Sequence, residues 1–128
     1  MKKFLVFSAA LLILTSCQKI EKKIQGNWII EEATYQNQDI LDILRYNVLS
    51  IEMNGTCKTP VIKKENSFSR DAIWNIEKKD GRHYLIINSD IPTWNQKFQI
   101  SFKERIQGDA KIPEIYLQSE NMFLKASK

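Results

Sequence analysis

The sequence predicts an all-β protein of about eight antiparallel strands, which is a small β-barrel or a related β-fold. Stretches rich in aromatic and β-branched residues recur about every 13 residues from Gly26 onward, close to the strand spacing of such folds. The pairs Asn54-Gly55 and Asp80-Gly81 are strong signals for hairpins. Phe98, Ile100 and Phe102 alternate with polar residues, as in a half-buried strand.

Each expected element follows from a local pattern. A short helix is expected over 39–46, because apolar residues there recur at helical spacing and Asp39 is a suitable N-cap. Residues 106–113 are expected to form a loop around Gly108, and Pro60 places the third strand at an edge or a bulge. The expected strands are 27–36, 46–53, 57–63, 71–78, 83–88, 95–104, 115–118 and 122–126.

Two hairpins have a predicted register. A two-residue turn at Asp80-Gly81 pairs Ile76 with Leu85 and Trp74 with Ile87, which places four apolar side chains on one face. A two-residue turn at Glu120-Asn121 pairs Leu117 with Leu124 in the last hairpin. These hairpins favour an antiparallel meander.

The first 16 residues have the pattern of a bacterial signal peptide. Lys2 and Lys3 precede an apolar stretch, Phe4 to Leu14, that is too short to span a bilayer. The following residues, Leu14-Thr15-Ser16-Cys17, resemble the lipobox of bacterial lipoproteins. The resemblance implies cleavage before Cys17, diacylglycerol on its thiol and acylation of its amino group. An ordinary signal peptide that ends at a Cys, or a short buried helix, is the alternative.

The rest of the chain divides into a tether and one domain. Residues 17–25 are the lipidated Cys and a charged tether, in which Ile20 and Ile24 could share one face of a helical turn. A flexible spacer is the other interpretation of the tether. Gln18 is not the Asp that retains some lipoproteins at the inner membrane, so we expect a lipid-anchored protein of the cell envelope, in the outer membrane. Residues 26–128 form the β-domain.

The start of the β-domain resembles a known family. Gly26-Asn27-Trp28, directly after the tether, resembles the Gly-X-Trp signature of lipocalins and lipocalin-like bacterial lipoproteins. The resemblance implies an up-and-down barrel in which Trp28 closes one end and packs near Leu124 of the last strand. A basic residue of the last strand covers the Trp in that family, and Lys125 is the candidate here. It also implies that the barrel holds a small apolar ligand.

The composition gives no support for an enzyme. There is one histidine, His83, and no phosphate-binding loop, dinucleotide fingerprint or nucleophile elbow, so we expect no catalytic residues, no metal site and no cofactor. Removing the leader with its two lysines reduces the net charge from +4 to +2, too small an excess to indicate nucleic acid. With Cys17 lipidated, Cys57 has no disulfide partner and is expected to be buried.

The aromatic residues are the candidates for binding, and two kinds of function remain open. The candidate ligand-binding residues are Trp28, Trp74, Phe98 and Phe102. In the first hypothesis they face a small hydrophobic molecule in or at the barrel. In the second they fill the interior, since an eight-stranded barrel is just wide enough for its own side chains. The protein would then be an envelope interaction module, an inhibitor or accessory subunit. Trp94, in a loop, would anchor a contact or cap the barrel.

Overall fold

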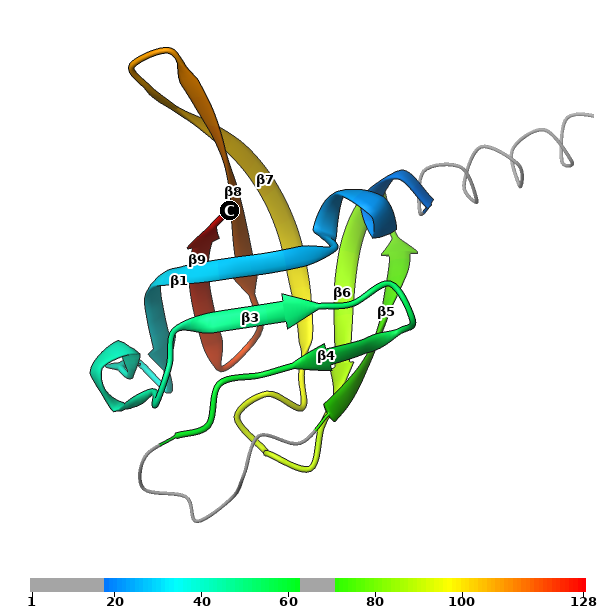
Figure 1. Cartoon of the computed structure of the whole chain (residues 1–128). Coiled ribbons are helices and arrows are strands. Elements are labelled where there is room, and N and C mark those ends of the chain that lie inside the picture. Colours follow the sequence, from blue (N-terminus) through cyan, green and yellow to red (C-terminus); the bar gives the residue numbers. More distant parts are fainter. Residues whose placement is uncertain (1–17, 63–70) are drawn as a thin grey trace, which may run out of the picture.

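The strands close into a barrel. The computed structural model describes residues 18–62 and 71–128, and within them nine strands form one antiparallel sheet in the order β2-β1-β3-β4-β5-β6-β7-β8-β9. β1 also pairs with β9, so eight strands form a closed barrel, and β2 is a short addition beside the end of β1 (Figure 1). The predicted all-β antiparallel barrel is therefore confirmed. The strands are β1 (Gly26–Tyr35), β2 (Gln38–Asp39), β3 (Val48–Ile51), β4 (Thr56–Lys58), β5 (Asp71–Lys79), β6 (Arg82–Asn88), β7 (Lys97–Gln107), β8 (Ala110–Gln118) and β9 (Met122–Ser127).

The predicted hairpin registers are correct. Asp80 and Gly81 both have positive φ, +52° and +78°, as a type I′ turn requires. β5 and β6 then pair Ile76 with Leu85 and Trp74 with Ile87. In the last hairpin Leu117 pairs with Leu124, also as expected.

The helix expected over 39–46 is wrong in extent. Residues 38–39 are strand β2, and only a 3₁₀ turn, η1 (Leu41–Ile43), follows. Asp39 lies just before this turn, and its side-chain oxygen accepts a hydrogen bond of 3.0 Å from the Leu41 amide. Leu44 already has extended backbone because it forms a β-bridge with Ile62, which ends the turn.

The loop expected over 106–113 is also wrong. β7 and β8 continue to a two-residue turn at Gly108 and Asp109, with Gly108 at a φ of +62°. Pairing of β7 with β6 stops at Gln99, and pairing of β8 with β9 begins at Glu114. The strand residues of 103–113, here called the arm, therefore pair with each other and with no other strand of the described chain, and the arm projects beyond the barrel (Figure 1).

The barrel interior is packed with apolar side chains. Trp28, Trp94 and Phe98 are at most 1% exposed, and Cys57 is buried as expected. They belong to one core cluster of residues that runs from Ile24 to Ala126. The core and all the strands of the described chain thus lie within residues 24–127.

The two ends of the barrel differ. The upper end in Figure 1 carries a helix over residues 18–24, the arm and Lys128. The lower end carries the turn at 36–37, the loop over 89–96 and the turn at 119–121. The tether is thus helical over residues 18–24, and Ile24 is fully buried at the end of this helix.

Candidate functional site

A pocket lies at the upper end of the barrel, over Trp28. Its volume is about 450 Å³. The helix over 18–24, the start of β1, the base of the arm and the end of the chain meet around it. Its lining residues are Lys23, Trp28, Phe102, Lys103, Glu104, Pro113, Glu114 and Lys128.

Trp28 closes the barrel beneath the pocket. Gly26 has a φ of +124°, a conformation that side-chain-bearing residues rarely adopt, and it lets the chain turn from the helix into β1. The indole nitrogen of Trp28 donates a hydrogen bond of 2.7 Å to the Ile24 carbonyl, so the ring is tied to the helix. The end position that the Gly-X-Trp resemblance implies for Trp28 is the one the chain adopts.

Two lysine amines lie over aromatic rings at the pocket. Lys128 Nζ is 4.8 Å from the centre of the Trp28 ring, and Lys23 Nζ is 4.3 Å from the centre of the Phe102 ring. Lys128 Nζ also donates a hydrogen bond of 3.2 Å to the Lys23 carbonyl oxygen. Burial of the Lys128 amine lowers its pKa. The expectation that Lys125 covers Trp28 is wrong, because the Lys125 amine instead lies 5.9 Å from the Tyr116 ring centre.

The base of the arm supplies the other wall. Phe102 is half-buried and pairs with Ile115, while Glu104 is exposed and pairs with Pro113 further out along the arm. The Pro113 carbonyl accepts a hydrogen bond of 3.1 Å from the Lys128 amide, which holds the end of the chain beside the arm.

A charge network on the outer wall occupies Glu114. Arg105 reaches Glu31 at 3.1 Å and Glu114 at 3.5 Å, and Lys125 reaches Glu114 at 3.6 Å. Hydrogen bonds from Ser127 and then Arg105 lower the pKa of Glu31. Glu114 Oε2 is buried and its cations stand at ion-pair rather than hydrogen-bond distance. Glu114 also lines the pocket, and its charge is balanced there by Arg105 and Lys125.

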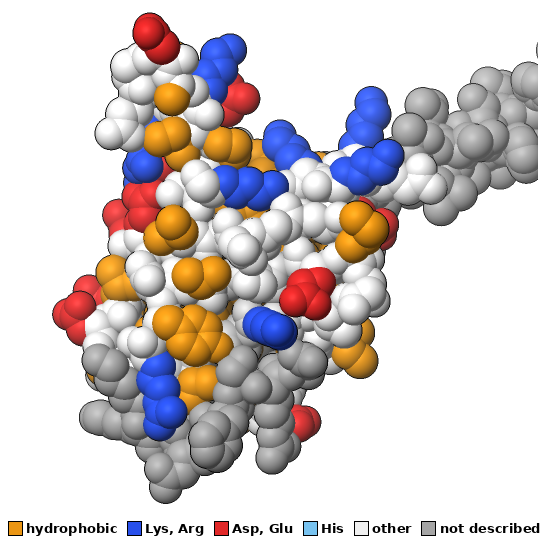
Figure 2. Space-filling model, in the orientation of Figure 1, with side chains coloured by type: hydrophobic (Ala, Val, Ile, Leu, Met, Phe, Trp, Pro, Cys, Tyr) orange, Lys and Arg blue, Asp and Glu red, His pale blue; other side chains and the backbone are white. Residues whose placement is uncertain are grey.

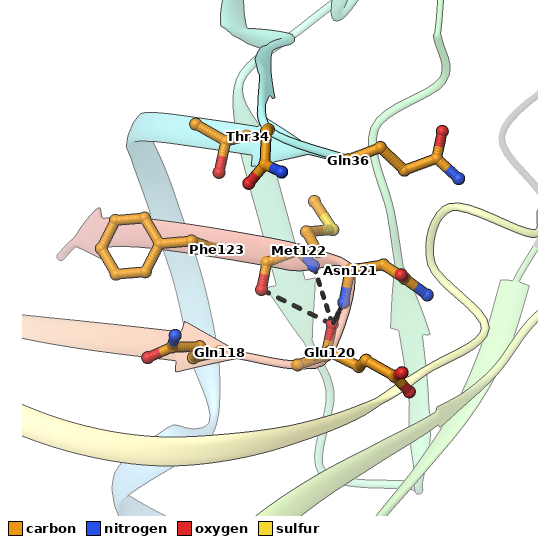
Figure 3. Close-up of a pocket in the computed structure, with 9 residues that line it drawn as sticks. Thr34, Gln36, Gln118, Glu120, Asn121, Met122 and Phe123 are labelled. Atoms are coloured by element: carbon orange, nitrogen blue, oxygen red, sulfur yellow. Dashed lines mark hydrogen bonds between the residues drawn. The ribbon is translucent and has the colours of Figure 1, made fainter.

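A second pocket of about 320 Å³ lies at the lower end and is polar (Figure 3). The turns after β1 and after β8 form it. Ser119 organises its floor, where its hydroxyl accepts a hydrogen bond of 3.0 Å from the Met122 amide and another from the Asn121 amide (Figure 3). Its lining residues are Thr34, Gln36, Asn37, Gln118, Ser119, Glu120, Asn121, Met122 and Phe123.

The structure brings together two of the four candidate ligand-binding residues. Trp28 and Phe102 both border the upper pocket. Trp74 and Phe98 lie in the core and line neither pocket; the Trp74 indole donates a hydrogen bond of 2.9 Å to the Glu52 carbonyl. Cys17, the predicted lipidation site, lies outside the described residues.

Sequence reasoning missed the lysines of the site. Lys23 belongs to the charged tether, and no local pattern marks Lys128, which reaches Trp28 only through closure of the barrel by β1 and β9. The helical spacing of Ile20 and Ile24 was the available signal for a docked tether. Trp94 is fully buried at the lower end, and its indole donates a hydrogen bond of 2.8 Å to the Pro60 carbonyl, so it acts as a cap.

Other classes of site find no support in the described residues. They contain no group of three or more His, Cys, Asp or Glu side chains placed to hold a metal ion. Across residues 18–62 and 71–128, no helix has the length and apolar character needed to cross a membrane. Comparison of the chain with family models, curated proteins and solved structures finds no match.

Proposed function

We propose that this protein is a lipid-anchored envelope protein that holds a small amphiphilic molecule in the pocket over Trp28. The observation that carries the proposal is the pocket itself. Its volume of about 450 Å³ falls in the usual range for small-molecule sites, and Trp28, Phe102 and Pro113 give it an apolar floor and wall. Because the pocket lies at the upper end of the barrel and not inside it, a ligand could bind there while the interior stays filled with side chains.

The anchor would lie close to this pocket. Cys17 directly precedes the helix over 18–24, which is about 10 Å long at 1.5 Å per residue. That helix ends with Lys23 at the pocket and Ile24 in the core. Acyl chains on Cys17 would therefore hold the upper end of the barrel near the membrane surface, where amphiphilic molecules concentrate.

The interior is a poorer place for the ligand than the mouth. Phe98 is fully buried, Trp74 is 5% exposed, and both pack in the same cluster as the other inward-facing residues of the barrel. A ligand inside would have to displace these side chains. Filling of small barrels by their own side chains is the ordinary arrangement at eight strands.

A fluorescent hydrophobic probe tests the proposal on residues 18–128, which contain every described strand and the whole described core. We expect saturable binding of about one probe per barrel, and a loss of affinity of about tenfold in Phe102→Ala, as expected when a large apolar contact is removed. Phe123→Ala is the matched control, because Phe123 is also half-buried but lines the lower pocket. A folded domain that binds no probe, or that loses affinity only in Phe123→Ala, would contradict the proposal.

The second candidate, an interaction module of the envelope, is favoured by the arm. Ile106 is 75% exposed on a hairpin whose strands, beyond the barrel, pair with no other strand of the described residues, and such unpaired edges can pair with another chain. A photo-crosslinking residue at position 106, with one at the exposed Ile73 as control, tests it in cells. One defined envelope partner crosslinked only from position 106 would favour this candidate over the first.

A further inference from the structure

We infer that the upper pocket takes an anionic amphiphile, with a phosphate or carboxylate head held by the amines of Lys23 and Lys128 and an alkyl chain against Trp28, Phe102 and Pro113. The inference rests on the proposed function and adds the charge of the ligand to it. The pocket offers two cations directly beside aromatic and proline surface, which are the two kinds of group that such a molecule needs.

Within the described residues, the two amines have no acidic partner at ion-pair distance. Neither Lys23 nor Lys128 forms an ion pair within 4 Å anywhere in residues 18–62 and 71–128. Both lie over ring faces, and Lys128 has one carbonyl hydrogen bond. Each ammonium group can donate three hydrogen bonds, so donors remain for an anion.

The carboxylates at the pocket do not cancel these charges. Glu114 is held by Arg105 and Lys125 on the outer wall. Glu104 is exposed on the rim and forms no ion pair with the described residues. The rim carboxylate therefore disfavours an anion moderately, since exposed charges are screened by solvent and salt.

The surroundings of the pocket are basic as well. Lys19 and Lys22 are exposed on the helix over 18–24, beside Lys23. Figure 2 shows basic side chains gathered between this helix and the arm, over the upper end of the barrel. Such a surface attracts anions and anionic membranes. Two sources could supply the head group: a free single-chain amphiphile, or a lipid of the membrane itself.

Calorimetric titration of residues 18–128 with matched probes tests the inference. Octyl phosphate and 1-octanol carry the same chain with and without the charge, and inorganic phosphate carries the charge without the chain. We expect octyl phosphate to bind at least tenfold more tightly than either. Vesicles of phosphatidylglycerol, compared with phosphatidylcholine, then show whether a membrane lipid is also accepted.

Variants locate the head group. Lys23→Gln and Lys128→Gln should each reduce the ratio of octyl phosphate affinity to 1-octanol affinity about tenfold, as for loss of a charge-assisted hydrogen bond. Lys22→Gln is the control, because it removes the same charge from the same helix outside the pocket. Glu104→Gln should tighten octyl phosphate binding about two- to threefold.

The failures are distinguishable. Equal affinity for octyl phosphate and 1-octanol would overturn the charge assignment and leave the proposed function standing. Inorganic phosphate binding as tightly as octyl phosphate would overturn the amphiphile and indicate a plain anion site. If no probe binds to the folded domain, the proposed function itself is wrong.

Discussion

The ammonium group of Lys128 lies 4.8 Å from the centre of the Trp28 ring and donates a hydrogen bond to the Lys23 carbonyl oxygen. One side chain at the end of β9 thereby joins the beginning of β1 to the helix before it. The contact also places a cation at the edge of the pocket. Lys128 therefore contributes both to the packing of the upper end of the barrel and to the proposed binding of an anion there.

Replacement of Trp28 by Ala should lower the free energy of unfolding by about 3–5 kcal/mol, the usual cost of removing a large buried aromatic side chain. Trp28→Phe keeps an aromatic ring but loses the hydrogen bond to Ile24, so it should cost less, about 1–2 kcal/mol. Urea denaturation measures both. A loss below about 1 kcal/mol in Trp28→Ala would contradict the burial of this ring.

Gly26→Ala should cost more than Gly55→Ala. Both glycines have positive φ, +124° and +84°, but an added Cβ at Gly26 would also stand 3.2 Å from Lys128 Cε, while Gly55 has open space. We expect a loss of about 2–3 kcal/mol at Gly26 and about 1 kcal/mol at Gly55. Equal losses in denaturant titrations would show that neither the φ of +124° nor the contact with Lys128 makes Gly26 more demanding than Gly55.

The Glu31 network should make stability depend on acid pH. The pKa of Glu31 is lower in the folded protein, so its contribution is present above the unfolded pKa and is lost as the pH falls through the folded value. The free energy of unfolding should therefore decrease from neutral pH to about pH 3, and less steeply in Glu31→Gln. Glu32→Gln, which alters an exposed neighbour, is the control. Identical slopes for Glu31→Gln and the parent protein would exclude this role.

Cys17→Ser should abolish lipid attachment, because only the thiol serves as the acceptor in the lipobox resemblance. We expect the variant to remain unprocessed or to become soluble. Fractionation of cells followed by a carbonate wash measures it. If the Cys17→Ser variant stays with the membrane as firmly as the parent chain, the lipobox interpretation is wrong.

The sequence predicts the barrel well where the information is local. The turn at Asp80-Gly81 sets the register of Trp74 and Ile87, because Asp and Gly both tolerate the positive φ of a type I′ turn. The arm was missed because Gly108 and Pro113 interrupt the strand pattern, although Pro113 lies just before the point where β8 begins to pair with β9.

The site was harder to predict than the fold. Trp28 and Phe102 were chosen as candidate ligand-binding residues because they are aromatic, and both border the upper pocket. The same reasoning also selected Trp74 and Phe98, which belong to the core and line neither pocket. Lys23 and Lys128 are 105 positions apart and meet only when β9 closes the barrel against β1. Nothing local in the sequence carries that long-range contact.

Nuclear magnetic resonance tests the central claim most directly, because the three tryptophan indole N–H groups report on different places. Trp28 borders the upper pocket, Trp74 lies in the core with its indole bonded to Glu52, and Trp94 caps the lower end. On titration of residues 18–128 with octyl phosphate, the Trp28 indole signal and the amides of residues 102–104 should shift most, with the Trp94 signal unchanged. Largest shifts at Trp74 and Phe98 would place the ligand inside the barrel and contradict the account, as would shifts confined to Trp94 and residues 118–123.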